Sequence, residues 1–175
     1  MRHRSPWFGI LAVTMAMPGL VLQADSAVSP VGNWHGTYTC AQGLTALDLW
    51  IAADNFSHVR ATFHFNAVPS NRGVPEGCFA MLGTFEPGSR RIRLAPDAWI
   101  LQPTDYILVG LDGHLNASGT QMTGRVTEAA TCTSFSLRHV SSKPTTPDAC
   151  KTAATVAVVP GTRFTPHWTS AALSP

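Results

Sequence analysis

Charged residues are scarce in this chain of 175 residues: Asp, Glu, Lys and Arg together make up 13%, about half of their usual share. The formal net charge is only +2. Basic side chains cluster at a single place, at Arg90, Arg91 and Arg93. A solvated strand face beside a turn would explain this cluster. We therefore expect no nucleic-acid partner.

Motifs that carry catalysis are also absent. The sequence contains no Gly-x-Ser-x-Gly, no His-Glu-x-x-His and no glycine-rich phosphate-binding loop. His58 and His64 share a predicted strand face but lie roughly 20 Å apart along the strand, too far to ligate one metal ion. We therefore expect a protein that is not an enzyme and that uses no cofactor and no metal.

The chain begins with features of an export signal. Arg2, His3 and Arg4 precede the apolar stretch Trp7–Leu22, which is short for a membrane span, and small residues follow. We expect residues 1–26 to be a signal peptide and the mature protein to begin between Gln23 and Val28. The protein would then be periplasmic or secreted, without a stable membrane anchor after cleavage. An uncleaved membrane anchor is the alternative.

Export decides how the cysteines are interpreted. None of the four forms a Cys-x-x-Cys pair, the spacing typical of zinc and redox sites. In an oxidising compartment, disulfides are the expected state of Cys40, Cys78, Cys132 and Cys150.

The sequence does contain segments in which apolar and polar residues alternate, which is the pattern of half-buried strands. The first is Val31–Cys40, with Trp34, Gly36 and Tyr38 on one face. Further strands are expected around Leu47–Ile51, Val59–Phe65, Phe79–Phe85, Ile92–Leu94, Tyr106–Leu111, Gln121–Thr127 and Cys132–Val140. About eight strands in succession predict an all-β, antiparallel up-and-down barrel, because closure removes exposed sheet edges.

Two long connections interrupt this pattern, Asn66–Gly77 and Ala95–Asp105, and the second could fold one helical turn around Trp99. Both lie at the same end of the predicted barrel. Shorter turns, at Asp54-Asn55, Glu86–Ser89 and Asp112–Ser118, lie at the other end. The barrel domain is expected over residues 27–140, and a Ser/Thr/Pro/Ala-rich, irregular tail over 141–175.

The order of strands also predicts disulfides. Strand one ends at Cys40 at the end of the barrel where its neighbour, strand eight, begins at Cys132, so these two should pair. One objection is that Cys132 alternates with outward-facing serines, which a bulge or a later strand start would remove. Cys78 then remains for Cys150. Two other pairings are combinatorially open.

The segment Gly32-Asn33-Trp34, near the start of the meander, resembles the Gly-x-Trp opening of the lipocalin and avidin (calycin-type) superfamily. The resemblance implies that Trp34 packs across a closed end and that ligand enters opposite, between longer loops. The runs WHGTYTCAQGLTALDLWI, VPEGCFAMLGTF and LAPDAWILQPTDY also resemble a small module of exported bacterial proteins.

The predicted interior is rich in aromatic residues, which leaves two alternatives: a packed core, the favoured one, or one small pocket. The inward set comprises Trp34, Tyr38, Phe63, Phe65, Phe79, Phe85 and Phe135. Trp50 is expected to face outward and Trp99 to lie in a loop, where each could contact a partner or a sugar ring, or pack under the tail.

Two functions follow from this arrangement. The first is an exported, lipocalin-like binding module that holds a small apolar or amphipathic ligand at the open end. The predicted lining residues are Asn71, Arg72, Glu76, Trp99 and Tyr106. The second is an interaction or inhibitor protein whose loops at this end bind a partner protein. An interior cavity below roughly 300 Å³ would be small for a typical ligand and would favour the second function.

Overall fold

The computed structural model describes residues 28–55, 57–146 and 148–151; the predicted signal peptide and residues 152–175 of the predicted tail lie outside these ranges. Within them the chain forms eight strands and one short 3-10 helix, η1. The elements are β1 (Gly32–Cys40), β2 (Gly43–Asn55), β3 (His58–Asn66), β4 (Gly77–Glu86), β5 (Arg91–Leu101), β6 (Gly110–Leu115), β7 (Gln121–Thr127), β8 (Ser134–Ser141) and η1 (Asp148–Cys150).

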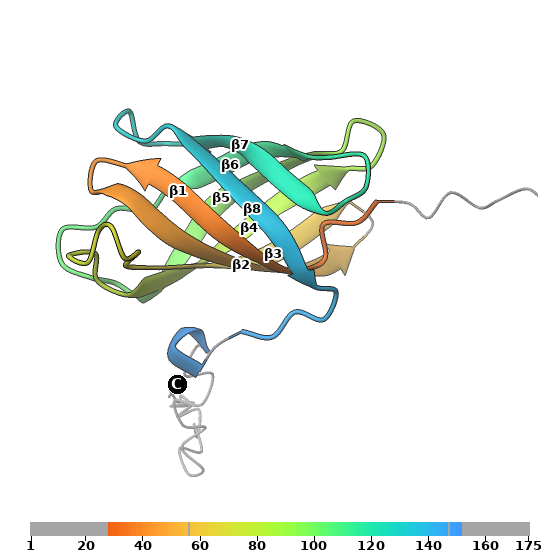
Figure 1. The fold of residues 1–175 in the computed structure, drawn as a ribbon. Coiled ribbons are helices and arrows are strands. Elements are labelled where there is room, and N and C mark those ends of the chain that lie inside the picture. Colours follow the sequence, from red (N-terminus) through yellow and green to blue (C-terminus); the bar gives the residue numbers. More distant parts are fainter. Residues whose placement is uncertain (1–27, 56, 147, 152–175) are drawn as a thin grey trace, which may run out of the picture.

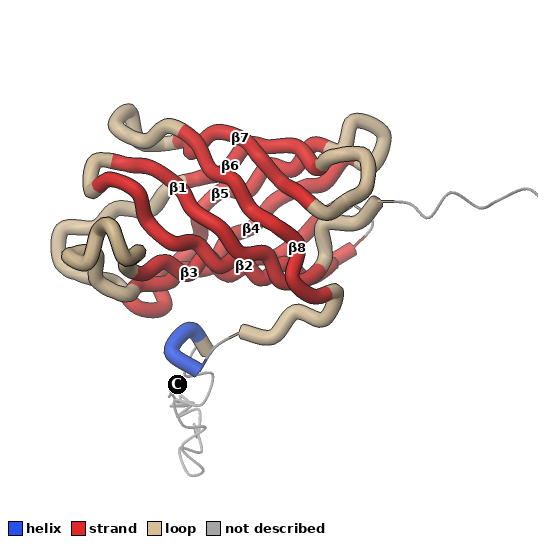
Figure 2. The backbone as a smooth tube through the Cα atoms, viewed as in Figure 1, coloured by secondary structure: helices blue, strands red, loops and turns tan. Residues whose placement is uncertain are grey.

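The eight strands form one closed antiparallel barrel in sequence order, which confirms the predicted fold class (Figures 1 and 2). β1 pairs with β8 over Trp34↔His139 to Tyr38↔Phe135, so no strand edge is left open along the closure. We call the end with loops 41–42, 67–76, 102–109 and 128–133 the open end, at the left in Figure 1. The opposite end, with the short turns 87–90 and 116–120, is the closed end.

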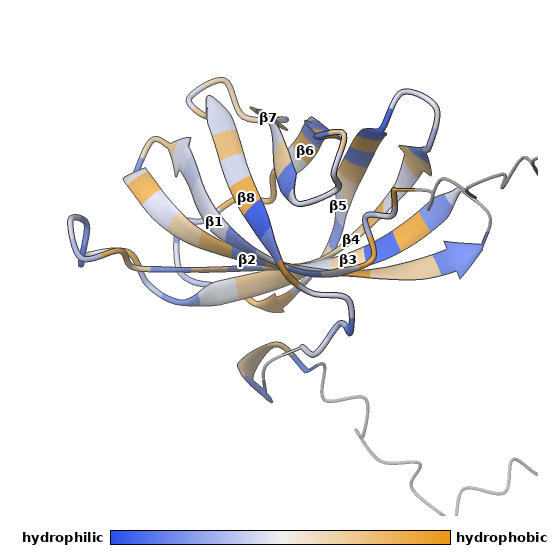
Figure 3. Ribbon diagram, turned by 45° about the vertical axis from the view of Figure 1, so that its right-hand side comes forward, coloured by the Kyte–Doolittle hydropathy of each residue, from blue (hydrophilic) through white to orange (hydrophobic). Residues whose placement is uncertain are grey.

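Hydrophobic and hydrophilic residues alternate along strands of the barrel, as the colours of the ribbon show in Figure 3. Because successive side chains of a strand point to opposite faces, this alternation builds the core. In β3 the inward residues Val59, Ala61, Phe63 and Phe65 are all buried, as predicted. The rings of Phe63 and Phe79 stack with their centroids 4.6 Å apart, and Tyr38 meets Phe63 edge-on at 5.2 Å. The middle of the barrel is therefore filled with side chains.

The closed end is covered by Trp34, whose side chain is 1% exposed. Its indole Nε1 donates a hydrogen bond of 2.8 Å to the Pro30 carbonyl oxygen, so the single polar atom of the ring is satisfied. Gly32 is required beside it, because its φ is 134° and a Cβ would lie 2.2 Å from the Ser141 carbonyl oxygen. These contacts explain the Gly-x-Trp sequence, and the fold is compatible with a calycin-type barrel.

The segment from Ala95 is not a long connection with a helical turn, as the sequence predicted, but part of β5. It pairs with β4 up to Leu101↔Cys78, with register shifts near Phe79 and Met81. β5 pairs with β6 only as far as Leu94, so beyond this point one edge of β5 is unpaired. Pro96 is tolerated there because no neighbouring strand needs its missing amide hydrogen. Trp99 is therefore a strand residue.

Three further boundaries differ from the prediction. The sixth strand begins at Gly110 rather than Tyr106, so the open-end loop covers 102–109. Asp112 belongs to β6, where it faces outward between the inward residues Leu111 and Gly113. In the sequence this stretch resembles a polar turn. Asp54 and Asn55 lie within β2.

The structure pairs Cys40 with Cys132 and Cys78 with Cys150, the two pairs that the strand order predicted. β8 begins at Ser134, after Cys132, which removes the objection about which face Cys132 occupies. The second disulfide fastens η1 to the outer wall. Residues 142–146 and 148–151, which we call the strap, run from the closed end along that wall to Cys150 (Figure 1).

Candidate functional site

A cavity of about 280 Å³ lies at the open end of the barrel. Its walls come from the end of β1, the inward rings of β3 and β4, and three open-end loops. The lining residues are Tyr38, Cys40, Ala41, Gln42, Phe65, Phe79, Asp105, Tyr106, Ile107, Val109, Ala129, Thr131 and Cys132. The interior is therefore packed with aromatic side chains below a hollow mouth.

Aromatic rings form the deep part of the cavity. Tyr106 stacks on Phe65 with a centroid distance of 5.2 Å and an interplanar angle of 15°. Tyr38 meets Phe65 edge-on at 6.5 Å. Since these rings also pack against the filled core, the cavity floor is preformed and apolar.

Polar groups at the β1–β2 turn complete one side of the cavity. The Gln42 amide donates hydrogen bonds to the Tyr38 hydroxyl oxygen at 3.0 Å and to the Thr45 hydroxyl at 3.3 Å. Burial raises the pKa of Tyr38 far above its usual value, nearby Tyr106 raises it further, and the hydrogen bonds oppose this shift. Tyr38 is thus a neutral phenol at physiological pH.

Of the five predicted lining residues, Tyr106 lines this cavity and the other four lie outside its walls. Asn71 instead stabilises the β1–β2 turn, because its amide donates to the carbonyl oxygens of Gln42, at 2.6 Å, and Leu44, at 3.1 Å. The Arg72 guanidinium donates within its own loop to the Pro69 carbonyl oxygen.

Trp99 packs against the core from β5, with its ring 5.2 Å from Phe79 and 6.4 Å from Phe65. It therefore supports the aromatic floor from behind. Glu76 points to the outer wall, where it meets His64. A binding role for these five residues remains a prediction.

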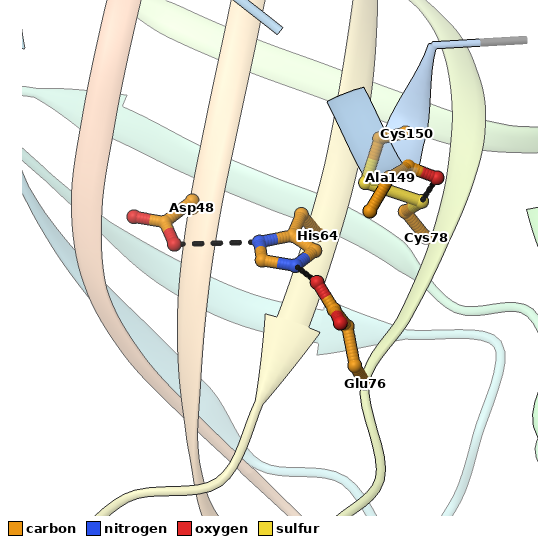
Figure 4. Close-up of a disulfide and its surroundings, with 6 residues drawn as sticks. All are labelled: Asp48, His64, Glu76, Cys78, Ala149 and Cys150. Atoms are coloured by element: carbon orange, nitrogen blue, oxygen red, sulfur yellow. Dashed lines mark hydrogen bonds and ion pairs between the residues drawn. A yellow bond between two sulfur atoms is a disulfide. The ribbon is translucent and has the colours of Figure 1, made fainter. Parts of the chain in front are cut away.

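The outer wall near the open end carries a chain of hydrogen-bonded ionisable side chains (Figure 4). The His64 ring lies between the carboxylates of Asp48 and Glu76, with nitrogen–oxygen distances of 3.4 and 2.8 Å, and Asp48 also meets His35 at 2.6 Å. Although His64 faces outward, it is only 6% exposed, and Trp50 lies 5.6 Å away from it.

These contacts shift the pKa values of His64 and Asp48 in opposite directions. The hydrogen bond to Asp48 raises the pKa of His64 against the effect of burial, and Glu76 raises it further. Burial acts to raise the pKa of Asp48, but the hydrogen bonds from His64 and His35 outweigh it and lower that pKa. These hydrogen-bonded side chains thus favour a protonated His64 between two carboxylates. The contact of His64 with Glu76 holds loop 67–76 against the wall.

A larger hollow, of about 830 Å³, lies outside the barrel beside the strap. Small outward side chains on the neighbouring strands, including Ala52, Thr62 and Ala80, form its base, and Trp50 borders it. The charged pair Asp54–Arg60 at its edge is satisfied within the protein. It is an open depression on the wall, without the aromatic enclosure of the mouth cavity.

The sequence did not single out Gln42, Asp105 or Ile107 as cavity residues. Each sits in a predicted turn, loop or strand at the open end, and only the packing of three separate loops brings them together. The available signal was the inward face of the first strand, which ends in Tyr38 and Cys40 and so leads into the cavity.

The fold and the cavity together define an eight-stranded antiparallel barrel with one closed and one open end. No known protein family matches the chain, and a search of curated proteins finds no match. Among the described residues, no group of three or more His, Cys, Asp and Glu is arranged to hold a metal ion. That part of the chain also has no helix long and apolar enough to cross a membrane.

Proposed function

We propose that this protein is an exported binding module that holds a small apolar or amphipathic ligand, about one ring in size, in the cavity at its open end. The aromatic-walled cavity carries the proposal, because it is the enclosed hollow among the long loops while the opposite end is covered by Trp34. The volume of about 280 Å³ falls below the usual range, roughly 300 Å³ and above, so a large ligand is excluded.

Export is supported by the two disulfides, which are consistent with an oxidising extracellular or periplasmic compartment. One of them, Cys40–Cys132, lines the cavity itself and joins the end of β1 to the loop before β8. It would keep the mouth at a constant width, which lowers the conformational cost of binding. The proposed role is binding, without a catalytic step.

Filling the cavity tests this function. Ala129 lines the cavity with a small, half-buried side chain, so Ala129→Phe should occupy the space without removing a core residue. In an NMR screen with single-ring fragments, the unmodified protein should show shifts at Tyr106 and Val109, and Ala129→Phe should show none. Fragments that bind equally well to Ala129→Phe, or that shift only outer-wall residues, would exclude the mouth as the site.

The second candidate, an interaction or inhibitor protein, is favoured by two observations: the cavity is smaller than the roughly 300 Å³ of a typical ligand site, and apolar side chains are exposed at the same end. Ile107 is 65% exposed at the cavity edge, and Leu44 is exposed at the start of β2. A cavity of this size would then receive one apolar side chain of a partner protein. In a pull-down from the organism that exports the protein, Ile107→Asp and Ala129→Phe should lose the same partner that the unmodified protein retains.

A further inference from the structure

We infer that the ligand of the mouth cavity is an organic cation, such as an alkylated ammonium group, held by aromatic rings and by the carboxylate of Asp105. This inference rests on the proposed function, because it names the chemical class of ligand for the same cavity. It depends on three features of the described residues: the rings, the single charge in the lining, and the distribution of charge at the open end.

Four aromatic side chains border the cavity: Tyr38, Phe65, Phe79 and Tyr106. Aromatic rings carry negative charge density on their faces and attract cations, most strongly where water is excluded. The ring of Tyr106 is fixed by stacking on Phe65, and Tyr38 is fixed by the hydrogen bond from Gln42. Tyr38 stays a neutral phenol, so it contributes a ring and a hydroxyl without a titrating charge.

Asp105 carries the only charge among the residues that line the cavity, since no Lys, Arg or His contributes to its walls. An anionic ligand would therefore find no partner there and would be repelled, whereas a cation would be attracted. Among the described residues, the Asp105 carboxylate has no ion pair and no side-chain hydrogen bond, unlike Asp48, Asp54 and Asp112. Its charge is thus free to act on a ligand.

The backbone of Asp105 is also unusual, because its φ of 65° lies in the left-handed region. Asp and Asn adopt this conformation more readily than other residues, so the loop positions a carboxylate here at little cost. The same fact makes Asp105→Asn a clean variant: it removes the charge and keeps a side chain that tolerates the conformation.

The charged residues around the mouth also favour a cation. The four open-end loops contain three carboxylates, Glu76, Asp105 and Glu128, and one cation, Arg72, and the protonated His64 beside Glu76 offsets one further negative charge. The basic residues Arg90, Arg91 and Arg93 lie at the closed end instead. An approaching cation is therefore guided toward the open end, an effect that weakens as salt concentration rises.

Three soluble probes of matched shape test the inference: choline, its neutral isostere 3,3-dimethylbutan-1-ol, and the anion 3,3-dimethylbutanoate. Each is titrated by NMR into the full chain with both disulfides formed, and binding is followed at Tyr106 and Val109. We expect choline to bind about 3- to 30-fold more tightly than the alcohol, which is the range that cation–aromatic attraction provides. The anion should bind weakest.

Asp105→Asn should weaken choline binding about 3- to 10-fold and leave the alcohol unaffected, because the carboxylate is exposed and its charge is partly screened. Asp97→Asn is the matched control, since it makes the same charge change on β5 outside the mouth cavity. Equal binding of choline and the alcohol, or equal effects of the two variants, would overturn the inference and leave the proposed function intact. If none of the probes shifts the mouth residues, the inference is overturned, whereas the proposed function falls only if the single-ring fragments also fail to bind there.

Discussion

The two ends of the barrel are built from the same eight strands, yet one is filled and the other is hollow. At the closed end short turns bring the strands together, and Trp34 covers the interior with its polar atom satisfied. At the open end four loops hold the strands apart around a cavity of about 280 Å³. The strands supply a rigid frame, and the length and packing of the connections decide which end can bind.

Charge distinguishes the two ends in the same way. At the closed end, Arg91 forms a two-point ion pair with Asp112, with contacts of 3.0 and 2.7 Å, which links β5 to β6. At the open end the protonated form of His64 holds Glu76 and the loop that it belongs to. One end is fastened by a guanidinium that stays charged, and the other by an imidazole whose pKa is raised by its contacts with Asp48 and Glu76.

Removal of Trp34 should give the largest loss of stability. Trp34→Ala would leave the closed end without its cover and create a large cavity, so we expect a loss of about 3–5 kcal/mol in the free energy of unfolding. Chemical denaturation measures it. Trp50→Ala is the control, because Trp50 is half-buried on the outer wall and should cost clearly less. A similar loss from both variants would contradict the role assigned to Trp34.

The disulfides come next, and their removal should affect the mouth cavity differently. The two bonds close loops with sequence separations of 92 and 72 residues, so removing either should cost about 2–4 kcal/mol. Cys40→Ser with Cys132→Ser should also abolish ligand binding, because this bond lines the cavity. Cys78→Ser with Cys150→Ser should release the strap and leave fragment binding at the mouth unchanged. Loss of binding in both double variants would argue against this division.

A smaller effect is expected from pH at the open end. The pKa of His64 is raised on folding, so its stabilisation is complete below the unfolded value of about 6.5 and is lost as pH rises through the folded value. The pKa of Asp48 is lowered, so its contribution is present above the unfolded value of about 3.9 and is lost as pH falls through its folded value. Stability should therefore decline above about pH 6.5.

His64→Gln should remove this decline and cost about 1.5–3 kcal/mol at pH 6, the value of a hydrogen bond to a charged group. Hydrogen exchange, corrected for the intrinsic pH dependence, should show loop 67–76 loosening above neutral pH while the turn 116–120 does not change. His114→Gln, an exposed histidine on β6, is the control and should keep the normal pH profile. A decline that persists in His64→Gln would show that another group titrates.

The smallest change in stability is expected from exposed apolar residues at the two ends. Ile107 at the open end and Val140 near the closed end are both 65% exposed, so Ile107→Asp and Val140→Asp should each change the free energy of unfolding by less than about 0.5 kcal/mol. Their effects on binding should differ. Ile107→Asp alters the cavity edge and should change fragment affinity, whereas Val140→Asp should not.

Much of the fold is predictable from the sequence because strand alternation is a local property. The run Val59–Phe65 specifies its inward face by itself, and Gln121–Thr127 has the predicted bounds. The sum of such local patterns determines a meander, and a meander with adjacent first and last strands brings Cys40 to Cys132. The resemblance of Gly32-Asn33-Trp34 to a Gly-x-Trp opening indicates which end is closed, although the contact that requires Gly32 is made with Ser141 of the distant strand β8.

Other features depend on contacts between distant segments, and only the tertiary structure decides them. β5 extends through Pro96 to Leu101 because β4 pairs with it on one side while its other edge is free. His64 lies on the outward face and would be exposed on an isolated strand, but Glu76, Trp50 and Asp48 surround it. The cavity itself forms where loops from three parts of the chain pack together, so its lining includes Tyr106 but not Trp99. Alternation specifies which way each side chain points, whereas the depth at which it is buried depends on what the rest of the chain places over it.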